Sequence, residues 1–77
     1  MPNKTFDSEF FIYTWNPEKG EYDVKKKHKE KNLIGTLEPQ NRNLTINIDE
    51  LKSMAPLSGL LFRDLISGLE HISNQYG

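Results

Sequence analysis

Few residues in this chain are of the types that perform acid–base or nucleophilic chemistry. It contains two histidines, His28 and His71, and no cysteine, so it offers no thiol nucleophile and no cysteine-based zinc site. The zinc motif H-E-x-x-H and the nucleophile motif G-x-S-x-G are both absent. We therefore expect both histidines to be exposed structural residues, because most surface histidines have no special role.

Asp49 and Glu50 are the one adjacent pair of carboxylates. Two carboxylates in a dry cleft can divide the roles of general acid and general base. These two follow a strand-like segment and precede a helix-like one, where Asp49 suits the N-cap and Glu50 the positive end of the helix dipole. Capping is the favoured interpretation. The sequence thus predicts no catalytic, cofactor-binding or metal-binding residue and no enzymatic activity, with a site shared across a homodimer (His71, Arg63, Asp64) as the residual alternative.

A run of lysines at residues 25–31, KKKHKEK, is the first feature that suggests a function. Lys25, Lys26, Lys27, Lys29 and Lys31 could neutralise phosphates, and exposed rings nearby could stack on bases. However, the run has no arginine and the chain as a whole carries a net charge of −1, whereas nucleic-acid-binding domains are usually basic. We favour a solvated loop at the frayed end of a strand, and keep nucleic-acid binding as the alternative function.

The aromatic segment SEFFIYTW at residues 8–15 is the second such feature, and it predicts a strand. Alternation places Phe10 and Ile12 on one face and Phe11, Tyr13 and Trp15 on the other, so the strand is apolar on both faces. Aromatic residues in so small a protein are usually core, but an uncovered aromatic face would favour a protein partner. The candidate partner-binding residues are Phe11, Tyr13, Trp15 and Tyr22.

These features require elements that position them, and the clearest is an amphipathic helix at residues 56–76. Most of its apolar residues fall on one arc at 100° per residue, with Phe62 and Ile66 on the flank and Leu60 facing the wrong way. Gly68 lies inside the arc, where a missing side chain would let another element come close. The members of the arc are Leu57, Leu61, Leu65, Leu69, Ile72 and Tyr76.

Four strands are predicted before this helix, at residues 8–15, 21–27, 32–38 and 44–49. A turn at 16–20 joins the first two and a turn at 39–43 joins the last two, so the strands form two hairpins. Leu33 and Leu37 should share a face, with Gly35 at a bulge or a close approach. The sequence predicts an α+β protein: an antiparallel sheet of three to four strands with one C-terminal amphipathic helix on one face.

The composition agrees with one small domain, residues 1–77, of which 1–7 form a loose N-terminal segment. Only 35% of the residues are apolar and 27% are charged, so the core is small and association with a partner would stabilise it. The absence of cysteine favours a reducing compartment, and no apolar run is long enough to span a membrane. We expect a cytoplasmic protein that binds neither a membrane nor a small-molecule substrate.

The function expected from these observations is a small non-enzymatic protein-interaction module, such as a regulator, inhibitor or accessory subunit. It would bind a protein partner or a second copy of itself through the aromatic sheet face that the single helix leaves open. The segment at residues 10–22, FFIYTWNPEKGEY, is similar to an N-terminal strand of the iron–sulfur subunits of respiratory dehydrogenases. Cluster-binding cysteines are absent, so no family is assigned.

Overall fold

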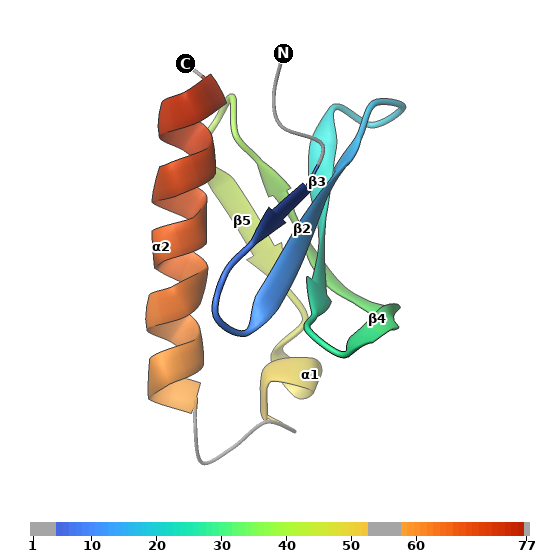
Figure 1. The fold of residues 1–77 in the computed structure, drawn as a ribbon, viewed down its shortest axis with the longest axis vertical. Helices are drawn as coiled ribbons and strands as arrows, with labels where there is room; N and C mark the ends of the chain where they lie inside the picture. The colour runs from blue at the N-terminus through green and yellow to red at the C-terminus, as the bar shows by residue number, and fades with distance from the viewer. Residues whose placement is uncertain (1–4, 53–57, 77) are drawn as a thin grey trace.

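The computed structural model describes residues 5–52 and 58–76, with the backbone alone at 29–31, 58 and 76. Five antiparallel strands follow one another in the order β1-β2-β3-β4-β5, and a short and a long helix come after them (Figure 1). The elements are β1 Thr5–Asp7, β2 Phe11–Asn16, β3 Glu21–Lys26, β4 Lys29–Glu38, β5 Asn43–Ile46, α1 Ile48–Lys52 and α2 Ser58–Tyr76. The predicted α+β fold is therefore confirmed, with five strands in place of three to four.

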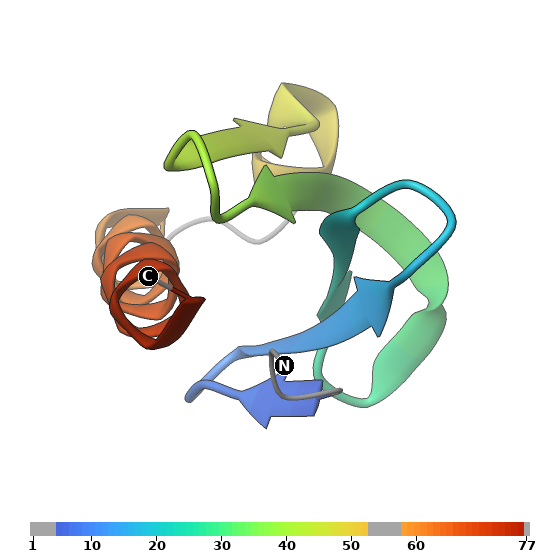
Figure 2. The same cartoon turned by 90° about the horizontal axis from the view of Figure 1, so that it is seen from above.

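The sheet curls, and α2 lies along its concave side, across the opening between the two edges (Figure 2). The core lies between this concave face and α2. Each strand from β2 to β4 contributes two buried side chains, which the helix covers with three of its own. The buried residues are Phe11, Tyr13, Tyr22, Val24, Ile34, Leu37, Leu61, Leu65 and Ile72.

Helix α2 buries the predicted stripe. Leu61, Leu65 and Ile72 are buried and Leu69 packs against them, whereas Leu60 is exposed as its position on the wheel predicted. Gly68 is buried against the ring of Tyr13 in β2, which confirms the expected close approach. The expected first residues of the helix, 56 and 57, lie outside the described residues.

The N-terminal region differs from the prediction. Residues 5–7, expected to be part of a loose segment, form β1 and pair with β2 in the register Phe6↔Tyr13. The predicted strand at 8–15 is shorter at its start, because Ser8 forms a turn in which its N–H donates to the Phe11 carbonyl oxygen at 2.9 Å. An extended segment of three residues carries too little periodicity to be recognised, so only its pairing with β2 reveals it.

The lysine-rich run ends one strand, as predicted, but the loop expected after it is only a two-residue turn. Lys25 and Lys26 end β3, Lys29 begins β4, and Lys27 and His28 form a tight turn in which His28 has a φ of 70°. The phase along β4 also differs from the prediction. The register shifts between the pairs Val24↔Gly35 and Lys25↔Leu33, so Ile34 has no direct partner on β3.

This bulge at Ile34 decides which side chains of β4 reach the core. Ile34 is 1% exposed and Leu33 is 50% exposed, so the prediction that Leu33 shares a face with Leu37 is wrong. An extra residue in one strand reverses the alternation beyond it. Gly35 lies at the bulge, where a Cβ would overlap the carbonyl oxygen of Thr45 in β5, so the close approach expected there is confirmed.

The end of β5 also differs from the prediction. The strand ends at Ile46, and Ile48, expected to point inward at the end of a longer strand, begins α1 and is 57% exposed. The cap of α1 is Asn47 rather than Asp49, because its Oδ1 accepts from the backbone N–H of Asp49 at 3.0 Å and of Glu50 at 3.4 Å. Asn and Asp are about equally good N-caps, so residue type alone does not select between positions 47 and 49.

Candidate functional site

The aromatic residues predicted to bind a partner lie inside the protein. Phe11 and Tyr13 are fully buried and Tyr22 is 2% exposed, so the prediction that they form an open face is wrong. Trp15 is partly buried, and its ring meets that of Tyr22 edge-on with centroids 5.0 Å apart. The reason is that α2 covers the concave face, and this face carries the larger aromatic set.

The opposite, convex face of the sheet is mainly polar where the strands pair. Thr14 and Thr36 flank Asp23, and Thr5 and Thr45 continue the row to the two edge strands. Paired threonines on neighbouring strands are stable in water and bury no large apolar area. The expectation that the sheet is apolar on both faces is therefore wrong along this row, and the uncovered face needs no partner there.

The lysines that could bind phosphate are divided between two strands and a turn. The Nζ of Lys27 donates to the backbone carbonyl oxygen of Ser8 at 2.8 Å, so this lysine fastens the β3–β4 turn to the β1–β2 turn. Lys25 and Lys26 are half-buried on β3. The side chains of Lys29 and Lys31 lie outside the described residues. Since Tyr13 and Tyr22 are buried, these rings cannot stack on bases beside the lysines.

The residues of the residual enzymatic alternative have structural partners. The carboxylate of Asp64 accepts from the hydroxyl of Ser8 at 2.7 Å and from the backbone N–H of Phe10 at 2.9 Å, and thereby holds the β1–β2 turn against α2. The ring of His71 stacks on that of Phe6 with centroids 4.3 Å apart. Among the described residues, no group of three or more His, Cys, Asp or Glu side chains could hold a metal ion.

The hydroxyl of Tyr13 is a buried polar group near Asp64. Burial raises the pKa of Tyr13 well above its ordinary value of 10.0, and the nearby negative charge of Asp64 raises it further. The nearby hydroxyl of Ser8 lowers this pKa in part, although the two hydroxyls do not meet with the geometry of a hydrogen bond. A phenol that holds its proton this tightly is unsuited to act as a base near neutral pH, so we interpret it as a core residue.

The surface feature best suited to binding is an apolar groove between α1, β5 and α2. Its volume is about 400 Å³. Leu44 and Ile46 line it from β5, Leu65 and Leu69 from the buried stripe of α2, and Phe62 and Ile66 from the flank of that stripe. The described residues that line it are Arg42, Asn43, Leu44, Ile46, Ile48, Leu51, Phe62, Leu65, Ile66 and Leu69.

Large apolar side chains at this groove face solvent. Phe62 is 57% exposed and Ile66 is 40% exposed, and Ile48 on α1 adds a third such residue. The groove exists because the apolar stripe of α2 is broader than the area that the sheet covers. Strand β5 has only four residues, and the chain then enters the five-residue helix α1. The sequence placed Phe62 and Ile66 on the flank of the stripe but contained no signal that the flank stays uncovered.

Opposite charges lie at the two ends of β5. Arg42 precedes the strand and has a φ of 52°, and its Nη2 donates to Oδ1 of Asn74 near the end of α2 at 2.9 Å. Asp49, which is exposed, follows the strand in the first turn of α1. Strand β5 therefore has a cationic residue before it, which lines the groove, and an anionic residue after it.

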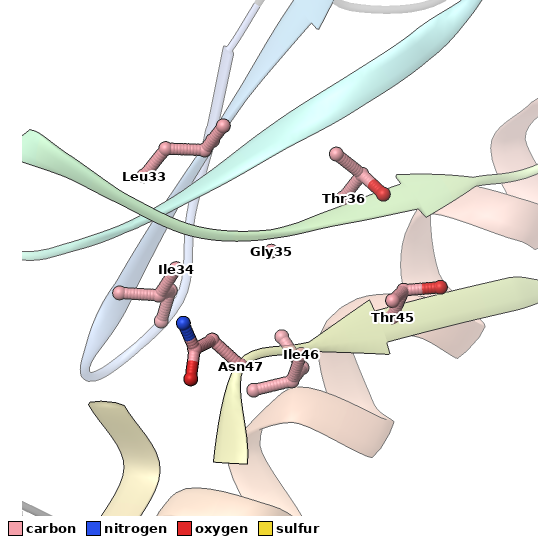
Figure 3. Close-up of a pocket in the computed structure, with 7 residues that line it drawn as sticks. All are labelled: Leu33, Ile34, Gly35, Thr36, Thr45, Ile46 and Asn47. Carbon is pink, nitrogen blue, oxygen red and sulfur yellow. The ribbon is translucent and has the colours of Figure 1, made fainter. Parts of the chain in front are cut away.

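A second, shallower hollow of about 370 Å³ lies where β4 and β5 pair (Figure 3). It forms beside Gly35, which has no side chain, and Leu33, Thr36 and Thr45 surround it. None of its lining residues carries an ionisable side chain. It therefore offers no chemistry beyond what the strand pairing itself explains.

Comparisons of the chain with protein-family models, with curated proteins and with solved structures found no match. Within the part of the chain that the structure describes, no helix has the length and apolar character needed to cross a membrane.

Proposed function

We propose that this protein is a small, non-enzymatic interaction module of the cytoplasm that binds a protein partner, or a second copy of itself, through the groove between β5 and α2. The observation that carries the proposal is the exposure of Phe62, Ile66 and Ile48 around one hollow. Soluble proteins rarely expose contiguous large apolar side chains unless the patch is a contact surface. The proposed binding surface is therefore this groove and not the aromatic face that the sequence predicted.

The character of the groove suits a protein rather than a small polar ligand. Its lining is mostly leucine and isoleucine with one phenylalanine, and polar groups lie at its rim, Arg42 and Asn43 among them. An apolar centre with a polar rim is the usual anatomy of a protein interface, and an aromatic anchor such as Phe62 often dominates its energy.

The test is site-specific photo-crosslinking in cells that express the protein. A photoreactive phenylalanine analogue replaces Phe62 in the groove, and in a matched control it replaces Glu18, which is exposed in the β2–β3 turn. We expect a protein adduct from position 62 and none from position 18. Excess unlabelled protein should abolish the adduct, whereas excess Phe62→Asp protein should not. Equal labelling from both positions, or no adduct from position 62, would overturn the proposal.

Nucleic-acid binding through the β3–β4 hairpin is the second candidate. It is supported by the concentration of five lysines within residues 25–31 of a chain that has ten basic residues in all. If it is correct, affinity for a single-stranded oligonucleotide falls steeply with salt, and Lys25→Glu with Lys26→Glu weakens it. Affinity unchanged by these substitutions would exclude the hairpin as the binding surface.

A further inference from the structure

We infer that the occupant of the groove is a second copy of this chain, paired antiparallel along the free edge of β5; this rests on the proposed function, because it names the partner at the same site. Strand β5 is the last strand of the sheet and pairs only with β4 among the described strands. An unpaired strand edge is a template for another strand, and here it borders exposed apolar side chains.

The register of β5 decides which of its backbone groups are free. The N–H of Asn47 donates to the carbonyl oxygen of Ile34 at 2.8 Å, and Thr45 lies opposite Thr36. Hydrogen-bonded residues alternate along an antiparallel strand, so Asn47 and Thr45 bond toward β4. The backbone groups of Leu44 and Ile46 therefore face the free edge.

This edge is complementary to itself. If two copies pair antiparallel about Thr45, Leu44 of each copy lies opposite Ile46 of the other, and each of these pairs exchanges both backbone hydrogen bonds. The side chains of Leu44 and Ile46 line the groove, so the new apolar pairs extend the groove wall toward Phe62 and Ile66. A two-fold axis through Thr45 produces the same contact twice.

Charge complementarity favours a second copy over an unrelated strand. When two copies pair antiparallel about Thr45, the end of β5 that Arg42 precedes lies beside the end of the partner strand that Asp49 follows, so opposite charges come to the same end of the interface. The symmetry axis repeats this pairing of opposite charges at both ends of the interface. A partner without this sequence would need its own charges in the same order, whereas a second copy supplies them by symmetry.

The first experiment measures the mass of the intact chain by analytical ultracentrifugation over a range of concentrations. We expect a monomer–dimer equilibrium. Thr45→Lys should weaken it at least about tenfold, because the two new lysines face each other across the axis. Thr36→Lys, on the same face of the neighbouring strand, is the matched control and should leave the equilibrium unchanged. Equal effects of the two substitutions would overturn the inference.

The second experiment tests the charges. Arg42→Glu and Asp49→Arg should each weaken the dimer about tenfold, and the double variant should recover most of the wild-type affinity. Because Arg42 also bonds to Asn74, Asn74→Ala reports the loss of that internal contact and should leave the dimer intact. If the dimer affinity of the double variant falls by as much as the two single substitutions lower it together, the proposed register is contradicted.

The two proposals, the groove as a binding site and a second copy as its occupant, can be overturned independently. A protein that stays monomeric at every concentration, while position 62 still crosslinks to a different protein, overturns the second copy but leaves the groove as a binding site. A monomer without any adduct from position 62 overturns both. Hydrogen exchange gives an independent readout, since a dimer should slow exchange at the amides of Leu44 and Ile46 as concentration rises; unchanged exchange in a dimer would overturn pairing through β5.

Discussion

The hydroxyl oxygen of Tyr13 lies 2.5 Å from the position that a Cβ atom on Gly68 would occupy. Two carbons of the ring lie within 3 Å of the same position. The side chain of Tyr13 thus fills the space that any side chain at residue 68 would need, and β2 and α2 approach this closely because residue 68 is glycine. The contact joins the aromatic strand to the helix at the centre of the core.

Replacement of Gly68 by alanine should therefore destabilise the protein. Alanine gains about 1 kcal/mol of helix propensity over glycine, but overpacking a filled core costs about 1–3 kcal/mol. Because the ring of Tyr13 is fully buried, it cannot move aside easily, so we expect the cost of overpacking to exceed the gain in helix propensity. Urea denaturation should show a lower free energy of unfolding for Gly68→Ala. Gly59→Ala, which has nothing within 4 Å of its Cβ, is the control and should be as stable as wild type or more so.

The raised pKa of Tyr13 predicts a loss of stability in alkali. Below pH 10 the phenol holds its proton in both states, so its contribution does not change with pH. Above pH 10 the unfolded chain loses the proton while the folded protein keeps it, so unfolding becomes more favourable as pH rises. The free energy of unfolding of wild type should fall more steeply above pH 10 than that of Tyr13→Phe. Identical slopes would show that burial does not perturb this tyrosine.

The substitution Tyr13→Phe should also change the stability of the protein at neutral pH. The hydroxyl of Tyr13 is buried beside that of Ser8 but makes no hydrogen bond of good geometry, because the Ser8 hydroxyl already donates to Asp64. Removing a buried polar group of this kind leaves no other group unpaired, so Tyr13→Phe should be neutral or more stable by up to about 1 kcal/mol. A large loss of stability, measured by thermal unfolding, would mean that the hydroxyl has a partner.

Asp64 should stabilise the fold through the β1–β2 turn. Asp64→Ala removes the carboxylate that accepts from the hydroxyl of Ser8 and from the N–H of Phe10. The hydroxyl keeps the carbonyl oxygen of Phe11 as a second acceptor at 3.2 Å, so we expect a loss of about 1–3 kcal/mol that comes mainly from the N–H of Phe10. Ser8→Ala also removes the hydroxyl oxygen that accepts from the N–H of Phe11 at 3.2 Å, but it should cost less because Phe10 keeps its shorter bond to the carboxylate. A double-mutant cycle of Asp64→Ala and Ser8→Ala measures the coupling between the two side chains. Glu70→Ala, exposed on the same helix, should have little effect.

Substitutions at the groove should separate binding from stability. Phe62→Ser removes a side chain that is more than half exposed, so the free energy of unfolding of the monomer should change by less than about 1 kcal/mol. Leu61→Ala, one residue earlier but buried, should cost about 2–5 kcal/mol. Crosslinking from groove positions and association should be lost with Phe62→Ser. A strongly destabilised Phe62→Ser protein would place this ring in the core.

Much of this fold could be predicted because it depends on neighbours in the sequence. Leu61, Leu65 and Ile72 were placed on one face of a helix because their spacing matches the helical period, whatever the helix packs against. The turn between β2 and β3 was predicted for a similar reason, since proline and glycine act on their own backbone. Strand β1 could not be predicted, because it is defined by pairing with β2. Gly35 did indicate a bulge, but which side chains the bulge turns into the core depends on the register with β3, which is not local to the sequence.

The candidate site was predicted only in part. Phe62 and Ile66 were recognised at the edge of the apolar stripe, which is a local property of α2. Whether such an edge is covered depends on where β5 ends, and the cap at Asn47 ends it earlier than the alternation of Leu44, Ile46 and Ile48 suggested. The groove therefore results from the relative lengths of two separate elements, β5 and α2, and from how they pack.

By itself, the sequence determined that the segment around Phe11 and Tyr13 is an aromatic strand and that the C-terminal segment forms a one-sided helix. Only the tertiary structure decided which face of the strand meets that helix. The alternation of side chains along a strand shows that the strand has two faces, but it does not show which of them is buried. The curl of the sheet and the contact of Tyr13 with Gly68 decide between the two faces: they turn the aromatic face inward, leave the threonine row in water and move the exposed apolar surface to the groove beside β5.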